Sequence, residues 1–329
     1  MAFSHLLELE NVHTELSLAE GTLRAVDGVS LTIDAGETLG IVGESGSGKS
    51  MTALSIMRLL PRSGRIVEGS IRFKDRVLSD LSEDEMEAIR GTEMAMIFQD
   101  PMTSLNPVYR TGWQVGEPLR IHRHVGSGEA IATATDLFRQ VGIPDARSRV
   151  RHFPHMLSGG MRQRAMIAMG LSMSPSLLIA DEPTTALDVT IQAQILDLLR
   201  RLNREYGTAT ILITHNLGVV AGMCDRVIVM YAGRIVEQGR TEDVFSHPEH
   251  PYTWSLLRSI PRLDAEPHEP LTPIEGSPPD MVHLPAGCKF QPRCPFAVAR
   301  CSREEPSLLQ VRDQLARCWV TQAGTELNG

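Results

Sequence analysis

The chain has 329 residues, 42% of them hydrophobic and 22% charged, with a formal net charge of −8. This is the composition of an ordinary globular protein, and it excludes collagen, low-complexity disorder and small disulfide scaffolds. The acidic total argues against broad electrostatic binding to DNA or to anionic lipid. No apolar run approaches the roughly 18 residues that cross a bilayer, and residues 1–10 lack the pattern of a secretory signal, so we expect a cytosolic protein.

The N-terminal part of the chain predicts strands, a glycine-rich loop and a helix. Residues 6–12 and 29–33 have strand patterns, and we expect these strands to be antiparallel. Residues 38–42 form a short apolar strand that runs into a glycine-rich loop, and residues 51–60 have helical spacing that stops at Pro61. The predicted order is therefore strand, glycine loop, helix.

The middle of the chain predicts mostly helical structure. Residues 93–98 predict one more strand, which ends at Gln99. Residues 112–174 have little β character, and residues 129–141 and 161–173 carry apolar residues at helical intervals. We therefore expect a helical insertion between two groups of strands.

Strand patterns resume after this insertion. Three near-continuous apolar runs are typical of parallel strands covered on both faces, and they span residues 177–180, 210–214 and 227–230. A helix between the first two has its apolar residues on one face, with Gly207 as its C-terminal stop. Residues 231–234 predict a hairpin turn before a strand at residues 235–238.

The C-terminal part combines prolines with cysteines. Seven prolines between Pro261 and Pro285 predict a linker to a small extension. Four of the five cysteines follow this linker, and they are Cys288, Cys294, Cys301 and Cys318. In a cytosolic protein, clustered cysteines hold metal more often than they form a disulfide framework.

Residues 43–50, GESGSGKS, match the phosphate-binding pattern G-x-x-x-x-G-K-S. In this pattern the glycines turn backbone N–H groups toward phosphate, the lysine neutralises phosphate charge, and the serine offers a hydroxyl to Mg²⁺. The candidate nucleotide-binding residues in this stretch are Gly43, Glu44, Ser45, Gly46, Ser47, Gly48, Lys49, Ser50 and Met51.

The apolar strand at residues 177–180 ends in two acids, Asp181 and Glu182. In the presence of a phosphate loop, Asp181 lies where a carboxylate would hold Mg²⁺, and Glu182 would face the γ-phosphate and activate water. The alternative is that these acids merely solvate a strand end. Their pairing with the phosphate loop favours the magnesium site.

Residues 157–164, LSGGMRQR, form the most informative stretch. Ser158, Gly159 and Gly160 open a helix and so present free N–H groups at its positive end, which makes an anion site. The alternative is a loop that merely caps a helix. This stretch is similar to the LSGGQ-type signature, and over residues 6–239 the chain resembles ATP-binding-cassette (ABC) ATPases.

The resemblance implies an α/β fold of the P-loop NTPase class. It implies a RecA-like core, an N-terminal antiparallel β subdomain, and a helical subdomain at residues 105–174. It also implies that two cassettes bind ATP and Mg²⁺ between them, with residues 43–50 of one facing residues 158–160 of the other. One chain would then hold half of each site.

The resemblance assigns further residues. Gln99 resembles the Q-loop glutamine, Ala186-Leu187-Asp188 the D-loop, and His215 the switch histidine. The implied catalytic residues are Lys49, Gln99, His215 and the general base Glu182. The implied Mg²⁺-site residues are Ser50, Gln99 and Asp181.

Longer strings are similar to the ATP-binding subunits of bacterial oligopeptide/dipeptide importers; they include residues 99–107, 153–164, 250–253 and 287–295. This resemblance implies an ATP-hydrolysing subunit bound peripherally to the cytoplasmic face of the inner membrane. The implied partners are two transmembrane permease subunits, a second cassette expected to be a paralogue, and a substrate-binding protein, with no nucleic acid. The implied divisions are an ATPase domain at 1–260, a linker at 261–287 and a Cys-rich extension at 288–329.

Two positions depart from the family pattern. Relatives usually stack adenine on an aromatic residue upstream of the phosphate loop, but none lies between Phe3 and Phe73. His13, Leu16 or Leu18 could occupy that position, and we expect base recognition to be weaker there. The importer pattern also has Asp after the switch histidine, where this chain has Asn216.

The C-terminal cysteines have the spacing C-x5-C-x6-C-x16-C. The cysteines of relatives imply a [4Fe–4S] cluster, for which four thiolates are the right count. Zinc and four unligated or oxidised thiols stay open as alternatives, although the lack of a C-x2-C pair makes a zinc ribbon less natural. Because these cysteines lie far in sequence from every nucleotide motif, we expect their role to be structural.

Two other functions compete with peptide import. A soluble ABC ATPase acting on nucleic acid or ribosomes is the alternative, but the single cassette, the lack of a heptad array and the acidic charge disfavour it. An inert regulatory cassette would lack the base that Glu182 supplies.

Overall fold

The computed structural model describes residues 5–100, 104–184, 188–259 and 273–327. The chain divides into two compact units, each described by itself. The first unit comprises residues 1–6, 33–38 and 77–213, and the second unit comprises residues 7–32, 39–76 and 214–329. The phosphate loop falls in the second unit, and the acidic strand end and the LSGG stretch fall in the first.

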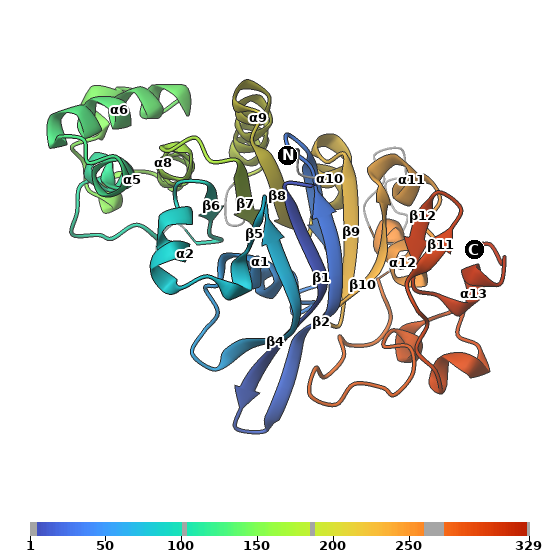
Figure 1. Cartoon of the computed structure of the whole chain (residues 1–329). Coiled ribbons are helices and arrows are strands. Elements are labelled where there is room, and N and C mark those ends of the chain that lie inside the picture. The colour runs from blue at the N-terminus through green and yellow to red at the C-terminus, as the bar shows by residue number, and fades with distance from the viewer. Residues whose placement is uncertain (1–4, 101–103, 185–187, 260–272, 328–329) are drawn as a thin grey trace. The chain divides into compact units, whose positions relative to one another are not determined.

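An antiparallel sheet lies at the N-terminal side of the second unit (Figure 1). Its strands are β1 (Leu7–Leu18), β2 (Gly21–Ile33), β4 (Gly64–Phe73) and the short β5 (Arg76–Val77), in the order β2-β1-β4-β5. β1 is longer than predicted because its register shifts between Glu10 and His13, where Asn11 has a φ of 47°. This irregularity breaks the alternation of buried and exposed residues, and the strand prediction depended on that alternation.

A second set of strands in this unit has the order β3-β9-β10-β12-β11. These strands are β3 (Thr38–Val42), β9 (Arg226–Tyr231), β10 (Arg234–Arg240), β12 (Gln314–Ala316) and β11 (Leu309–Val311). β3 and β9 are parallel, with Ile41 opposite Ile228, and β9 turns back into antiparallel β10. The predicted apolar strands and the hairpin turn at residues 231–234 are confirmed.

Short helices complete the second unit. They are α1 (Lys49–Met57), α10 (Leu217–Met223), α11 (Thr241–Ser246), α12 (Pro251–Arg258) and α13 (Trp319–Gln322), with 3₁₀ turns at Gln291–Arg293 and Ala299–Ser302. α1 ends three residues earlier than the predicted stop at Leu60, because Arg58 adopts a left-handed conformation that caps the helix.

The C-terminal extension shares the core of the second unit. Its strand β12 pairs antiparallel with β10, which places Glu237 opposite Ala316 (Figure 1). Phe290 is 1% exposed and contacts the rings of Tyr231 and Tyr252. The extension is thus ordered by packing on the strands beside it.

Three parallel strands form the sheet of the first unit, in the order β8-β7-β6. Their bounds are Met94–Ile97 for β6, Leu177–Asp181 for β7 and Ala209–Thr214 for β8. Helix α9 (Val189–Tyr206) connects β7 to β8, buries Ile195, Leu198, Leu199 and Leu202, and ends at Gly207 with a φ of 65°. The predicted helix face and its glycine stop are confirmed.

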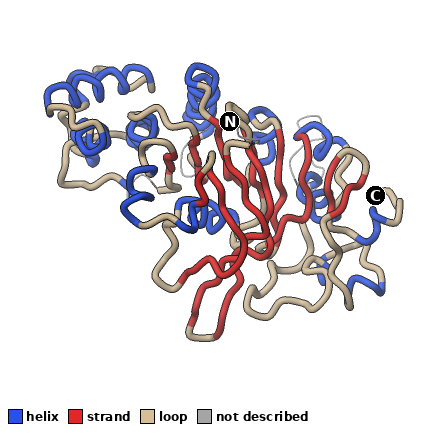
Figure 2. The backbone as a smooth tube through the Cα atoms, viewed as in Figure 1, coloured by secondary structure: helices blue, strands red, loops and turns tan. Residues whose placement is uncertain are grey.

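The predicted helical insertion lies between β6 and β7. Among its described residues it contains helices and loops but no strand (Figure 2). The helices are α4 (Thr111–Val115), α5 (Glu117–His122), α6 (Ser127–Gln140), α7 (Ala146–Arg149) and α8 (Gly159–Leu171), with a 3₁₀ turn at Pro154–Met156. The unit also holds α2 (Glu83–Ile89) and the 3₁₀ turn Leu78–Asp80. In the described part of the chain, no helix has both the length and the apolar character needed to cross a bilayer.

Candidate active site

The phosphate loop connects β3 to α1, as the sequence predicted. All five residues of β3 are buried, so the strand fixes the start of the loop in the core of the second unit. Gly43, Gly46 and Gly48 have φ values of 153°, 78° and 102°. Non-glycine residues rarely adopt these values, so the glycines are needed for the path of the loop. Ser45 and Gly46 are exposed at its tip, and Ser50 and Met51 are half-buried in the first turn of α1.

Lys49 folds back beneath this loop. Its Nζ donates hydrogen bonds to the carbonyl oxygens of Gly43, at 2.8 Å, and Glu44, at 2.7 Å, and lies 3.4 Å from Oγ of Ser47. The lysine is 5% exposed, so its charge is held by backbone dipoles inside the curve of the loop. This arrangement places one fixed positive charge where a bound phosphate chain would lie.

Three residues outside the motif also hold the loop. The N–H of Glu44 donates to the hydroxyl of Tyr252 at 2.7 Å, and the N–H of Gly233 donates to the carbonyl of Ser47 at 3.0 Å. The guanidinium of Arg293 pairs with the carboxylate of Glu44. Sequence reasoning missed these contacts because the partners are up to 249 residues away from the loop and carry no local pattern.

The first unit brings Gln99 and Glu182 together. Both follow neighbouring parallel strands, since Ile97 of β6 lies opposite Ala180 of β7. Nε2 of Gln99 donates to Oε2 of Glu182 at 3.0 Å. Glu182 has a φ of 44°, and its N–H donates to the carbonyl of Ile213 at 2.9 Å. A non-glycine residue in this sparsely populated φ region carries a cost in backbone energy, and such residues cluster at functional sites.

Asp181 and Asp188 have different surroundings. Asp181 is the last residue of β7 and is 6% exposed. Asp188 is the N-cap of α9, and its Oδ1 accepts the N–H of Ile191 at 2.9 Å. The rest of the predicted D-loop, Ala186 and Leu187, lies outside the described residues, as does part of the string that follows Gln99.

The LSGG stretch begins helix α8. Ser158 is its exposed N-cap, with Oγ accepting the N–H of Met161 at 3.3 Å. Gly159 and Gly160 lie in the first turn, where the backbone N–H groups have no hydrogen-bond acceptor within the helix. A Cβ atom at Gly160 would lie 2.9 Å from Cγ2 of Ile191, so α9 also packs too closely for a larger residue. The predicted anion site therefore lies at the N-terminus of a 13-residue helix that is capped by an exposed serine.

His215 and Asn216 come directly after β8. They belong to the second unit, and both are exposed. Asn216 is the N-cap of α10, because its Oδ1 accepts the N–H of Val219 at 3.3 Å. Asn and Asp are about equally good in this role. The departure from the family pattern at this position therefore keeps the cap and removes only the charge.

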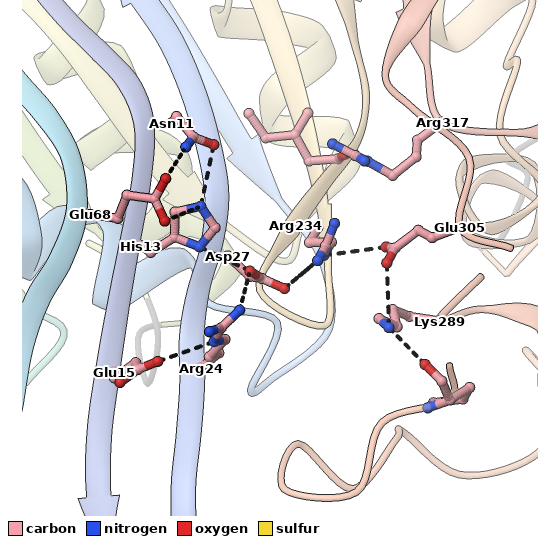
Figure 3. Close-up of polar contacts among 12 residues, drawn as sticks. Asn11, His13, Glu15, Arg24, Asp27, Glu68, Arg234, Lys289, Glu305 and Arg317 are labelled. Atoms are coloured by element: carbon pink, nitrogen blue, oxygen red, sulfur yellow. Dashed lines mark hydrogen bonds and ion pairs between the residues drawn. The ribbon is translucent and has the colours of Figure 1, made fainter. Parts of the chain in front are cut away.

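The three candidates for contact with adenine differ in their environments. His13 is directed into a polar network, with Nδ1 3.0 Å from Oδ1 of Asp27 and Nε2 3.2 Å from Oδ1 of Asn11 (Figure 3). Leu16 is half-buried, and Leu18 is 45% exposed. The contacts of His13 leave the two leucines as the less constrained candidates.

The four C-terminal cysteines are free and lie in the second unit. Burial, together with the nearby Cys301 and Cys318 thiols, raises the pKa of Cys288 to about 11 and the pKa of Cys294 to about 12. These thiols are thus close enough for their charges to interact. Within the described ranges, however, no three His, Cys, Asp or Glu side chains are gathered as a metal site, so the predicted iron–sulfur cluster is not supported.

Comparison with known proteins matches this geometry to a family. A model described as ABC transporter matches residues 26–185, and one described as oligopeptide/dipeptide transporter, C-terminal region, matches residues 236–301. The oligopeptide transport ATP-binding protein OppD of Salmonella typhimurium is 53% identical over 301 residues, covering 92% of this chain and 89% of that protein. A putative peptide import ATP-binding protein of Brucella abortus is 52% identical over 324 residues, covering 95% of this chain and 96% of that protein.

Solved structures agree. A dimeric post-hydrolysis state of the ATP-binding cassette MJ0796, bound to ADP and Pi, has a TM-score of 0.65 and 29% identity, covering 71% of this chain and 98% of that one. A phosphate loop curled around a lysine, an acidic strand end and a serine-capped signature helix on this fold define an ABC-type ATPase. The chain belongs to the ABC transporter family, among the ATP-binding subunits of oligopeptide and dipeptide importers.

Proposed function

We propose that this subunit hydrolyses ATP at sites shared with a second cassette and thereby drives peptide import through two permease subunits. The observation that supports this most directly is the pair of unlike half-sites in one chain. The loop around Lys49 supplies a phosphate cradle, and the exposed helix start at Ser158 supplies a second group of N–H donors. This chain and a second cassette placed head to tail would complete two sites.

The residues of the first half-site have distinct roles in this proposal. Lys49 and the N–H groups of the loop bind the β- and γ-phosphates, and residues 158–160 of the other cassette bind the γ-phosphate from the opposite side. Asp188, at the start of α9, belongs to the loop that faces the other cassette. His215 stabilises the γ-phosphate as charge develops on it.

Glu182 acts as the general base. Its hydrogen bond from Gln99 supports this role, because an amide donor directs the carboxylate without transferring a proton to it. Gln99 then orients both the water and the base. The fixed φ of 44° at Glu182 keeps the side chain at this strand end.

The residues present fit a bound Mg²⁺. Asp181 offers a carboxylate at the buried end of β7, Ser50 offers a hydroxyl in the first turn of α1, and Gln99 offers an amide oxygen. These are the oxygen ligands that Mg²⁺ prefers. When bound, Mg²⁺ neutralises charge on the phosphates of ATP.

The partners and location follow from the family. We infer peripheral binding to the cytoplasmic face of the inner membrane through permease subunits, with a substrate-binding protein on the other side. The chain would be an ATPase domain at residues 1–260, a linker at 261–287 and a Cys-rich extension at 288–329. The match of the oligopeptide/dipeptide transporter C-terminal model to residues 236–301 supports the inferred partners and location.

Reconstitution tests the proposal. The chain would be purified with its permease subunits and second cassette, and placed in vesicles with a labelled oligopeptide and its binding protein. We expect ATP-dependent peptide accumulation, which Glu182→Gln stops and the surface control Glu205→Gln on α9 retains. ATP hydrolysis without any association with hydrophobic subunits would contradict it.

We also propose that Cys288, Cys294, Cys301 and Cys318 bind a [4Fe–4S] cluster. Four thiols are the right number for this cluster, and bound iron would draw them together and hold them as thiolates although burial raises the pKa values of Cys288 and Cys294. The cluster would stabilise the extension. Iron content after anaerobic purification tests this proposal.

A further inference from the structure

The C-terminal extension reaches the phosphate loop through one side chain. Arg293, which directly precedes Cys294, donates from its two terminal nitrogens to the two carboxylate oxygens of Glu44, at 2.6 and 3.0 Å. The side chain of Arg293 is 5% exposed and that of Glu44 is 25% exposed. A two-pronged pair of this kind is directional, and removing one partner leaves the other charge poorly solvated.

The same loop residue is held a second time through its backbone. The N–H of Glu44 donates to the hydroxyl of Tyr252 at 2.7 Å. Tyr252 is fully buried, and its ring lies 4.7 Å from that of Tyr231 and 5.4 Å from that of Phe290. Phe290 comes from the same short segment as Arg293, between Cys288 and Cys294. This segment therefore supports both contacts to Glu44.

A second chain of contacts runs from this segment toward the other end of the loop (Figure 3). Lys289 lies 3.3 Å from Glu305, which lies 3.2 Å from Arg234. Arg234 in turn pairs with the buried Asp27 at 2.6 Å. The residue before Arg234, Gly233, bonds the loop directly at Ser47. The extension thus contacts the loop at Glu44 and supports the turn that contacts it at Ser47.

We propose that Arg293 is a positioning residue of the nucleotide site, which holds the phosphate loop in its ATP-binding conformation through Glu44. The loop needs such support because its exposed tip, Ser45 and Gly46, has little side chain to pack. Ordering a glycine-rich loop in advance lowers the entropy lost when ATP binds. ATP affinity then depends on the order of the cysteine-bearing segment, whatever the four thiols bind.

Linkage makes the coupling reciprocal. If the docked segment raises the affinity for ATP, bound ATP must favour the docked segment by the same factor. The backbone of residues 288–294 should then be protected when ATP binds, although it carries no residue of the nucleotide motifs.

Nucleotide titration of the purified full-length chain tests the first half of this inference. Arg293→Ala and Glu44→Gln should each weaken ATP binding by about fivefold or more. The double variant should bind ATP no more weakly than the single variant that has the lower affinity. Arg293→Lys, which keeps the charge but loses the fork, should be intermediate. Arg300→Ala is the matched control, since Arg300 lies in the same extension but pairs with Glu304 at 2.8 Å. Wild-type affinity in Arg293→Ala, or losses that add in the double variant, would overturn the proposal.

Hydrogen exchange tests the second half and separates positioning from folding. Saturating ATP should slow amide exchange in residues 288–294 of the wild-type chain and leave it unchanged in Glu44→Gln. Glu44→Gln changes no residue of the extension, so it keeps the test decisive if Arg293→Ala fails to fold. Exchange in residues 288–294 that ignores ATP in the wild-type chain would refute the coupling.

Discussion

Gln99 and Glu182 are 83 residues apart in the chain, yet the amide of Gln99 donates to the carboxylate of Glu182 at 3.0 Å. The contact forms because β6 and β7 are adjacent parallel strands whose carboxyl ends meet at one sheet edge. Gln99 is thus connected directly to the proposed base. This contact underlies the first prediction.

Glu182→Gln should lower ATP hydrolysis by at least about 10²-fold, because an amide keeps the shape of the side chain but cannot accept a proton from water. ATP binding should be unchanged. The measurement is steady-state hydrolysis in the assembled importer, with Glu205→Gln, an exposed change on α9, as the control. A rate above about a tenth of wild type would show that another group is the base.

Gly43→Ala should lower the free energy of unfolding more than Gly46→Ala. A Cβ atom at Gly43 would lie 2.3 Å from the carbonyl oxygen of Met230, whereas one at Gly46 meets nothing within 4 Å. Both substitutions carry the cost of a positive φ, about 1 kcal/mol, and only Gly43→Ala adds a backbone clash, which costs about 1–3 kcal/mol more. Denaturant unfolding of the two variants measures the difference. Equal free energies of unfolding would contradict this account of the loop.

Purine discrimination should be weak. With no aromatic residue between Phe3 and the loop, the lost stacking on adenine is worth about 1 kcal/mol, and GTP should compete with ATP within about tenfold. Leu16→Tyr should raise the preference for ATP if Leu16 is the contact, and Leu18→Tyr serves as the paired test of its exposed neighbour. A preference above about a hundredfold in the wild-type chain would mean that another residue reads the base.

His250 should make the chain lose stability in acid. It is fully buried, its Nδ1 accepts the N–H of Tyr252 at 3.1 Å, and burial, aided by the charge of Arg317, lowers its pKa from 6.5 to about 3. Because the folded-state pKa is depressed, the stability that His250 contributes above pH 6.5 is lost as the pH falls through the window from 6.5 toward 3. The slope approaches about 1.4 kcal/mol per pH unit.

The variant His250→Asn isolates this effect, because asparagine keeps an acceptor at the N-cap of α12 and does not titrate. Burial raises the pKa of the neighbouring Glu237 to about 8. The stability that Glu237 contributes is therefore lost in the opposite direction, as the pH rises from 4.5 to 8. Lowering the pH from 7 to 5 should therefore shift the melting temperature upward more in the variant than in the wild-type chain, because only the wild-type chain loses the contribution of His250. An equal shift in the two chains would exclude His250 as the group responsible.

Protein purified without oxygen should be brown and contain about four irons per chain if the four C-terminal thiols hold the proposed cluster. Cys318→Ser should lower the iron content, whereas Cys224→Ser, which changes a buried cysteine beside α10, should leave it intact. Colourless, iron-free protein with a folded extension would exclude the cluster, and about one zinc per chain would favour a zinc site.

Much of the nucleotide site is written locally in the sequence. Residues 43–50 must form a phosphate loop because their glycines and lysine have one physical use when they follow a buried strand and precede a helix. Ser158 and Asp181 are likewise defined by immediate neighbours, a helix start and a strand end. Strand β4 was not predicted, because only two of its ten residues are buried and they leave little hydrophobic pattern.

The support of that site was decided by tertiary structure. Arg293 meets Glu44 across 249 residues, and Tyr252 meets the same residue across 208. Neither contact has a periodic or motif signal, since a buried ion pair requires only that two distant side chains be brought together by packing. The sequence placed the cysteines far from the nucleotide motifs and predicted a purely structural role. The fold joins β12 to β10 and thereby brings the segment between Cys288 and Cys294 onto the phosphate loop.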